Sequence, residues 1–363
     1  MLKTLDRYIL GKFLSTFFFT VLIFTLISVF IDFSEKVEKF ITEPITRREI
    51  LLIYYPGFIV FIAKILWPLY TLIAVIFFTS RMASNSEILS AFNAGVSFKR
   101  LMRPYLVGAG VLMVIFLAGS HFFVPWISKL RLEIVHTHLD KNSDKGKTSN
   151  VHVFTAPGEK VFVQQYRKAD STARNFRLER FDSSGLVFLL QADQAQYQGG
   201  PPHRWKVKNF IIRTFHGEDE GIFMGRGMEA DTTINLHPGD FVDYKEQQDM
   251  MTTPNLLRYI RQQKERGAGN TRKYESELHT RSAEAVTILI LTIIGMAVAA
   301  RKVRGGIGLH LALGISIGGL YVMLSRFAIV FATGEAMPVL LGIWMPNLIF
   351  GGVALYLVSK AQK

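Results

Sequence analysis

Apolar residues along this chain gather into long runs that polar segments separate. Four runs contain no charged residue: 13–31 (19 residues), 104–128 (25), 305–325 (21) and 336–359 (24). At ~1.5 Å rise per residue, each run extends roughly 28 Å or more as a helix, enough to cross a hydrocarbon core of ~30 Å. The pattern therefore predicts a polytopic α-helical membrane protein.

Two further apolar segments complete the set of predicted spans. One covers 56–80 and is interrupted by Lys64, and the other runs from about 282 to 301. Three spans then lie on each side of a polar insert. We accordingly divide the chain into 1–128 (spans one to three), 129–276 (the insert with a helical connector) and 277–363 (spans four to six). The remaining spans are expected at about 12–32, 104–127, 305–327 and 337–359.

Lys and Arg in the short connecting segments predict the orientation, because cytoplasmic loops of membrane proteins carry an excess of these residues. With the amino terminus inside, the inner segments hold 12 basic residues and two acidic ones, Asp6 and Glu87. The short outer segments hold five basic residues against six acidic ones. We therefore expect both termini in the cytoplasm and the insert outside. The inner basic residues are Lys3, Arg7, Lys12, Arg81, Lys99, Arg100, Arg103, Arg301, Lys302, Arg304, Lys360 and Lys363.

The insert shows the alternation of β-strands. Val151 and Val153 alternate with polar neighbours, as do Val161 and Val163, around a turn at 156–158. Short strands at this spacing predict an all-β sandwich or barrel. The region 253–277 is helical and charged, and we interpret it as a connector into span four. Further alternating segments are 176–181, 186–192 and 205–215.

Composition narrows the class of protein. Hydrophobic residues make up 49% of the 363 residues, and the net charge is +13. Residues 129–284 carry 24 Lys and Arg against 21 Asp and Glu, so most of the surplus belongs to the membrane portion. A nucleic-acid-binding protein would concentrate that surplus in its soluble part, and no nucleic-acid partner is expected. Because cysteine is absent, disulfides, thiol chemistry and cysteine–zinc sites are excluded.

No signature of soluble catalysis is present. The sequence lacks the phosphate-binding GxxxxGK(S/T) motif, HExxH and G-x-S-x-G. His136 and His138 have no acidic or histidine partner at metal-ligand spacing, so we interpret both as solvated and predict no metal site. Gly314 and Gly318 form a GxxxG pair, which is typical of helix packing.

Lys64 is the informative charge within a span. A lysine at mid-bilayer costs ~2.5–3.5 kcal/mol on insertion scales. It lies roughly 25 Å from the inner boundary, near the outer headgroups, where its ammonium can snorkel. Alternatively, it lines a cavity that receives an anionic lipid head group. Lys36 and Lys39 lie at the same depth and complete the candidate lipid-binding set, although their alternation with Glu35 and Glu38 also suits a self-compensated surface helix.

The inner loop between spans two and three contains the signal of a short helix. Ser84 and Glu87 have the spacing of a capping box, in which the two side chains bond amides at a helix start. Apolar residues then fall on one face, and a glycine is placed to end the helix. We predict an amphipathic helix over 84–95 that docks a cytoplasmic partner or, alternatively, lies in the headgroups. The apolar face and the glycine are Ile88, Ala91, Phe92 and Gly95.

Five short regions, in this order and spacing, carry a family resemblance. They are Leu5-Asp6-Arg7-Tyr8-Ile9, Trp67-Pro68-Leu69, Ser86-Glu87-Ile88 with Ala94-Gly95-Val96-Ser97 and Arg100, Glu277-Leu278-His279 with Arg281, and Trp344-Met345-Pro346-Asn347. With three spans on each side of a β domain, the whole chain resembles the LptF/LptG permeases of the lipopolysaccharide exporter. The first region is similar to the start of the LptG branch. The chain departs from the family at Ala285 and Met296, where prolines are common, and at Asp32 and Phe33, near which some members carry a lysine.

The resemblance implies a non-catalytic subunit in the bacterial inner membrane. Its expected partners are a second permease subunit, which completes a heterodimer, and a cytoplasmic dimer of ABC ATPases that hydrolyses ATP. It would extract lipopolysaccharide and pass it through its jellyroll-like β domain to a periplasmic bridge protein of jellyroll type. No cofactor is expected in this chain. The implied ATPase-coupling residues are Ser84, Glu87, Ile88, Phe92, Gly95 and Arg100, and the implied lipid path in the β domain follows Val151, Val153, Val161 and Val163.

Two other classes of membrane protein are alternatives. A membrane-anchored sensor or binding protein would recognise a ligand with the outer β domain, but it would need neither six spans nor a docking helix. A secondary transporter is disfavoured, because no predicted span carries the paired acidic residues expected for proton or sodium coupling.

Overall fold

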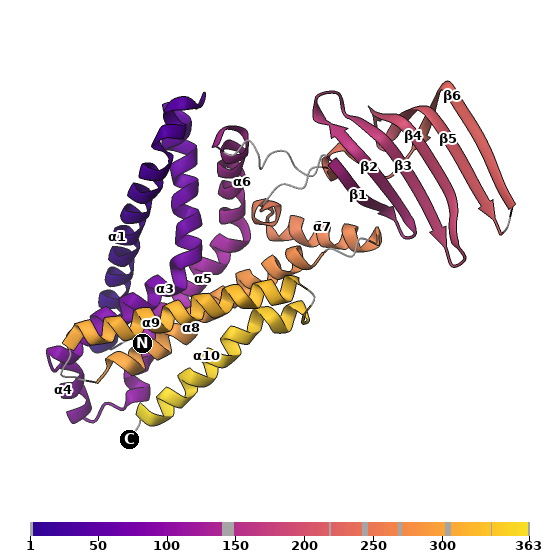
Figure 1. Ribbon diagram of the computed structural model, residues 1–363. Helices are drawn as coiled ribbons and strands as arrows, with labels where there is room; N and C mark the ends of the chain where they lie inside the picture. Colours follow the sequence, from indigo (N-terminus) through magenta and orange to yellow (C-terminus); the bar gives the residue numbers. More distant parts are fainter. Residues whose placement is uncertain are drawn as a thin grey trace. The chain divides into compact units, whose positions relative to one another are not determined.

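The computed structural model describes residues 3–139, 149–217, 219–241, 246–267, 271–301, 306–334 and 336–361. The chain divides into two compact units, whose strands and longer helices are labelled in Figure 1. The helical unit comprises Met1–Ile134, Gln248–Thr253 and Arg272–Lys363, and the β unit comprises Val135–Gln247 and Pro254–Thr271. The predicted inner residues Lys302, Arg304 and Lys363, and residue 305 of predicted span five, lie outside the described residues.

Six helical segments of the described chain are long and apolar enough to cross a membrane, which confirms the predicted class. The short helix α4 (Glu87–Asn93) lies between the second and third. The six are α1 (Thr4–Thr42); α2 (Arg47–Glu49), η1 (Ile50–Tyr54) and α3 (Tyr55–Ser84) in succession; α5 (Phe98–Ala118), η2 (Gly119–Phe123), α6 (Val124–Ile134) and η3 (Val135–Leu139) in succession; α8 (Arg272–Ala299); α9 (Gly306–Thr333); and α10 (Val339–Ala361).

Two helices run well past the apolar segments that predicted them. α1 continues to Thr42, beyond the expected end near 32, and α8 begins at Arg272 rather than near 282. The polar first turns of α8 are helical because their side chains have protein partners. Arg272, for example, donates to the carbonyls of Ala332 and Met337 at 3.2 and 3.1 Å. Hydropathy thus predicts the part of a helix that lies in lipid. It does not predict where the helix begins or ends when its polar turns are stabilised by other contacts.

Large apolar side chains hold the helices together. Phe13, Tyr70, Tyr105 and Ile288 belong to one buried cluster, which α1, α3, α5 and α8 share. A Cβ on Gly314 would lie 2.3 Å from Ile76 of α3, so α9 approaches α3 closely where the GxxxG motif predicted helix packing. Other large apolar side chains point outward and are more than half exposed, as expected where a helix faces lipid. They include Phe18, Phe30, Leu348 and Leu355.

The β unit contains one antiparallel sheet of six described strands in sequence order, labelled in Figure 1. The predicted first hairpin is confirmed: Val151 lies opposite Val163, and Val153 opposite Val161. The described strands do not form two sheets. Instead, Leu236 and Phe241 join the apolar core of the sheet, and Trp205 Nε1 donates to the Leu236 carbonyl at 3.0 Å. The strands are β1 (Ser149–Ala156), β2 (Glu159–Arg167), β3 (Thr172–Asp182), β4 (Gly185–Gly199), β5 (Arg204–His216) and β6 (Asp219–Thr233).

Two features of the β unit differ from expectation. Strand β6 was not predicted, because its side chains are mostly exposed and Gly225 and Gly227 interrupt any alternation. Pairing with β5 along most of its length keeps it extended. The interpretation of His136 as a solvated histidine is wrong, because its side chain is buried in η3. The shorter elements are η4 (Lys168–Asp170), η5 (Pro238–Phe241), η6 (Gln247–Met250) and α7 (Thr253–Glu265).

Candidate functional site

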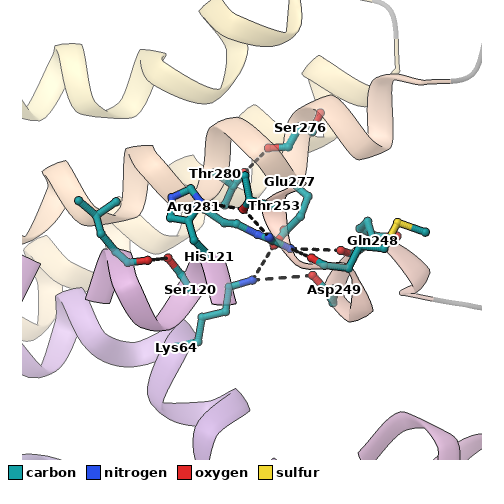
Figure 2. A network of polar contacts seen from close by, with 12 residues as sticks. Lys64, Ser120, His121, Gln248, Asp249, Thr253, Ser276, Glu277, Thr280 and Arg281 are labelled. Carbon is teal, nitrogen blue, oxygen red and sulfur yellow. Dashed lines mark hydrogen bonds and ion pairs between the residues drawn. The ribbon is translucent and has the colours of Figure 1, made fainter. Parts of the chain in front are cut away.

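A buried ion pair joins α3 to α8. Lys64 Nζ lies 2.9 Å from Glu277 Oε1 and 3.7 Å from Asp249 Oδ1. The side chains of Lys64 and Glu277 are 12% and 10% exposed, so each charge depends on the other for the stabilisation that water would otherwise provide. Figure 2 shows the lysine directed at these carboxylates. The snorkelling interpretation is therefore wrong, because the ammonium is buried beside protein partners instead of reaching the surface.

Arg281 extends this pair into a network. It lies one helical turn from Glu277 on the same face of α8, and its side chain is fully buried. Nε donates to Glu277 Oε1 at 2.9 Å, and Nη1 donates to Thr253 Oγ1 at 3.0 Å. Nη2 donates to the carbonyls of Gln248 and Met251 at 3.2 and 3.0 Å (Figure 2). A planar guanidinium can serve all four acceptors because its N–H groups point outward in a fixed fork.

The segment Gln248–Thr253, which runs from η6 to the first residue of α7, is thus bonded to the helices of the helical unit at several points. His121 adds another, because its Nδ1 lies 2.7 Å from Thr253 Oγ1. His121 belongs to η2, a π-helical turn, and such turns are often found at functional sites. The network therefore positions this segment against α3, η2 and α8, and it balances two cations with two carboxylates.

A second polar cluster lies on α1 and η1. Asp32 is buried and accepts hydrogen bonds from Tyr54 Oη at 3.1 and 2.9 Å, and from Lys36 Nζ. The Lys36 ammonium also lies 5.2 and 5.6 Å from the ring centres of Tyr54 and Phe58. Its acidic partner is Asp32, one helical turn away.

The structure separates the three lysines of the predicted lipid-binding set. Lys64 is buried, the side chain of Lys36 is 30% exposed, and Lys39 is exposed. Lys36 and Lys39 lie on α1, and Lys64 lies on α3 in a different network. Counting residues along a helix measures depth in the bilayer but not which face a side chain occupies. Their binding of lipid stays a prediction.

The loop helix α4 begins later than predicted. Ser84 is the last residue of α3, so its backbone is helical and cannot adopt the extended conformation of an N-cap. The residue before α4 is Ser86, which has φ 62° and makes no capping bond through its side chain. The capping box of Ser84 with Glu87 is therefore wrong. Glu87 instead accepts a hydrogen bond from Tyr8 Oη at 3.1 Å.

The predicted end and apolar face of α4 are confirmed. Gly95 has φ 81°, a left-handed conformation that favours glycine, and its amide donates to the Phe92 carbonyl at 2.9 Å. Ile88 is buried in the core of the helical unit, and Phe92 packs against the same core. The apolar face of α4 therefore packs against the core of this chain, while Leu89 is 54% exposed.

Arg100 connects the start of α5 to the start of α1. Its two terminal nitrogens donate to the two carboxylate oxygens of Asp6 at 2.7 and 2.8 Å. Asp6 is buried, so this bidentate pair anchors the beginning of α1. The Arg100–Asp6 pair and the Tyr8–Glu87 hydrogen bond thus connect the start of α1 to α4 and to the start of α5. A coupling role for Arg100 stays a prediction.

The four valines of the predicted lipid path share one face of the sheet. Val151, Val161 and Val163 are buried in the core of the β unit, and Val153 is half-buried at its margin. Their neighbour His152 is exposed, which confirms the predicted alternation. The structure thus places the valines together, whereas their contact with lipid stays a prediction.

Comparison with protein families gives a match over residues 7–360 to the model described as lipopolysaccharide export system permease LptF/LptG. The chain belongs to the LptF/LptG family. Comparison with curated proteins gave no match. As an LptF/LptG permease, the chain is a multi-pass membrane component of lipopolysaccharide export and a transporter subunit, not a catalytic enzyme.

Sequence reasoning missed several polar residues of this LptF/LptG permease. Asp249 and Thr253 lie in a polar segment that gave no motif, and His121 lies in an apolar run. One signal was available, since Glu277 and Arg281 are four residues apart and share a helix face. Their partners on α3 and η2 had no such signal, because these contacts join distant parts of the sequence.

Proposed function

We propose that this LptF/LptG permease is one half of a heterodimer in an ABC transporter that extracts lipopolysaccharide from the bacterial inner membrane. The observation that carries the proposal is the family match over residues 7–360, together with six apolar helices and an inserted β unit. The chain has no nucleotide-binding motif, so a cytoplasmic dimer of ABC ATPases supplies the energy. The similarity of the first residues to the LptG branch favours an LptG-like role.

The basic inner segments support cytoplasmic termini, a cytoplasmic α4 and a periplasmic β unit. In this arrangement α4 receives the movement of the ATPases. Ile88 and Phe92 anchor the helix in the core, which leaves Leu89 and its neighbours to contact the partner. Movement of α4 reaches α1 through the bond between Glu87 and Tyr8.

α1 carries Lys36 and Lys39 at its other end, where a lipid bearing phosphate groups would meet them. Because they are more exposed than Lys64, these two lysines are the better candidates for phosphate contacts. Lys64 instead compensates the carboxylates of the buried network. The outward-facing Phe and Leu side chains of the spans suit acyl chains.

The β unit passes the lipid to a periplasmic bridge protein of jellyroll type. β6 is the last strand of the sheet, so one of its edges has no described strand beside it. Its apolar side chains are more than half exposed, which favours the addition of a strand from another β protein. These side chains are Ile222, Phe223, Met224 and Met228.

Site-specific photocrosslinking tests the proposal. A photoreactive residue at Val153, on the margin of the inner face, should capture lipopolysaccharide when ATP is present, and the same residue at His152 on the opposite face should not. ATP is required because removing an acylated lipid from a bilayer forfeits ~0.8 kcal/mol per buried CH₂. Glu87→Ala should reduce capture without altering the folded permease. Equal capture at both positions, or full capture without ATP, would overturn transport and favour a sensor.

A further inference from the structure

A cavity of about 640 Å³ lies in the helical unit where α5 begins and where α8 and α10 end. This volume is within the range of protein pockets that hold small ligands. Phe98 and Ala300, which belong to the buried core, form part of its lining, as do the half-buried Phe92 and Ala361. Much of the lining is therefore apolar, and it suits a ligand with a hydrocarbon portion.

Two cations give the cavity its charge. They are Lys99 from α5 and Arg301, which follows the end of α8. No carboxylate lines the cavity among the residues that the structure describes. Within the same part of the chain, neither cation forms an ion pair with an acidic side chain. An anionic group in the cavity would therefore compensate both of them.

The two cations are placed at helix ends. Arg301 Nη2 donates to the Lys360 carbonyl in the last turn of α10 at 3.1 Å. This bond uses one of the five N–H donors of a guanidinium, so others can serve a further acceptor. Lys99 lies in the first turn of α5, where the positive end of the helix dipole adds to the attraction for an anion.

Both cations lie at the depth of lipid headgroups. Lys99 precedes the charge-free run 104–128 by five residues, or ~7.5 Å of helix. Arg301 lies two residues beyond Ala299, the last residue of the apolar helix α8. In the orientation of the proposed function, on which this step rests, these ends of the spans face the inner leaflet. Basic pockets between spans on the cytoplasmic side are typical binding sites for anionic headgroups.

We propose that this cavity binds the phosphate group of an anionic phospholipid such as phosphatidylglycerol. The phosphate pairs with Lys99 and Arg301, and the first carbons of an acyl chain pack along Phe92 and Phe98. A zwitterionic lipid would bring a further cation close to these two, so it binds more weakly. A soluble phosphate ester has the same anionic group but lacks the chain that the apolar lining receives. This resident lipid is separate from the lipid that the permease transports.

Native mass spectrometry of the permease, purified in detergent in the assembly in which it is made, tests the site. Phosphatidylglycerol, phosphatidylethanolamine and glycerol 3-phosphate would be added separately at matched concentrations. We expect the tightest-bound phosphatidylglycerol to be retained several-fold more than phosphatidylethanolamine, and glycerol 3-phosphate to be lost. Lys99→Gln combined with Arg301→Gln should abolish this preference. Lys12→Gln combined with Arg81→Gln is the matched control, because it removes two exposed cations outside the cavity and should leave the preference unchanged.

Ala361→Trp tests the location, because it occupies part of the cavity, keeps both cations and should reduce retention of phosphatidylglycerol. The thermal unfolding midpoint of each variant shows whether the helical unit stays folded. In the unmodified permease, phosphatidylglycerol should raise this midpoint, since a ligand that binds the folded state stabilises it.

Equal retention of the two phospholipids by the unmodified permease would overturn the proposal. An equal loss of preference in the two double variants would do so as well, because it would make net charge and not the cavity responsible. Retention of glycerol 3-phosphate to the level of phosphatidylglycerol would also overturn it and would assign the cavity to soluble phosphate esters. The measurement uses neither lipopolysaccharide nor ATP, so its outcome is separate from that of the proposed function.

Discussion

Two ion pairs, one in each unit, have similar lengths and opposite surroundings. Lys64 and Glu277 lie 2.9 Å apart in the helical unit, with side chains that are 12% and 10% exposed. Lys208 and Glu229 lie 2.6 Å apart on the sheet, with side chains that are 41% and 47% exposed. Distance alone would rank the second pair as stronger. Losing one partner should nevertheless cost more free energy in the buried pair. Water can replace a missing partner on the sheet but cannot do so in the buried network.

The difference shows that the buried charges of this network depend on one another for compensation. Glu277 serves Lys64 and Arg281 together, and Arg281 also holds the segment Gln248–Thr253. Removing one member leaves others buried without compensation. Lys36 is intermediate, since its side chain is 30% exposed and its partner Asp32 keeps a second donor in Tyr54.

The largest expected effect is that of Lys64→Met. It removes the ammonium that contacts both Glu277 and Asp249 and leaves Arg281 to compensate Glu277. Breaking a buried pair in this way costs about 3–5 kcal/mol. Adding Glu277→Gln should cost less than the sum of the two single changes, because the two residues share one interaction. Unfolding of the purified permease in detergent measures both. Lys39→Met is the control, and an equal loss there would contradict the comparison.

Arg281→Lys should have the next largest effect. Lysine keeps the charge but cannot reach Glu277, Thr253 and two carbonyls at once, so we expect a loss of about 1.5–3 kcal/mol. Hydrogen exchange should become faster in the segment Gln248–Thr253. Arg301→Lys is a matched control, because Arg301 is exposed and donates to one carbonyl, that of Lys360. Unchanged exchange in Arg281→Lys would show that the segment is held by other contacts.

Lys36→Met should cost about 1 kcal/mol, because Asp32 loses a charged donor and keeps the Tyr54 hydroxyl. The sharper measurement is lipid capture. Charge reversal at Lys36 and Lys39 together should reduce lipopolysaccharide crosslinking to the permease while the fold is preserved. If Lys64→Met reduced crosslinking more than this pair, at equal amounts of folded protein, exposure would not be the property that selects lipid contacts.

The smallest effect is expected for Glu229→Gln on the sheet. The hydrogen bond from Lys208 holds the pKa of Glu229 below its ordinary value of 4.5. A carboxyl whose pKa is lowered by folding stabilises the fold above that ordinary value, and the contribution disappears as pH falls through the lower, folded value. The variant should therefore differ slightly from the unmodified permease at neutral pH and match it in acid. Hydrogen exchange of β5 and β6 at both pH values measures this, and a larger difference in acid would contradict the assigned sign.

The sequence by itself determined the features that are written in one continuous segment. A charge-free run of 19 or more residues specifies a span wherever it occurs, because the cost of leaving backbone and charges in lipid is local. The hairpin that pairs Val151 with Val163 is equally local, since a period of two and a short turn set its register. The end of α4 followed from Gly95 alone, because few other residues tolerate its backbone conformation.

Only the tertiary structure decided where the polar groups went. Lys64 meets Glu277 across 213 positions of sequence, and no periodicity relates two residues so far apart. The same holds for the start of α4, where the continuation of α3 through Ser84 removed the cap that the motif predicted. β6 is extended because β5 pairs with it. For Lys64 and for β6, a partner outside the segment itself outweighed the local preference, since a buried charge or an unpaired strand costs more than the local signal contributes.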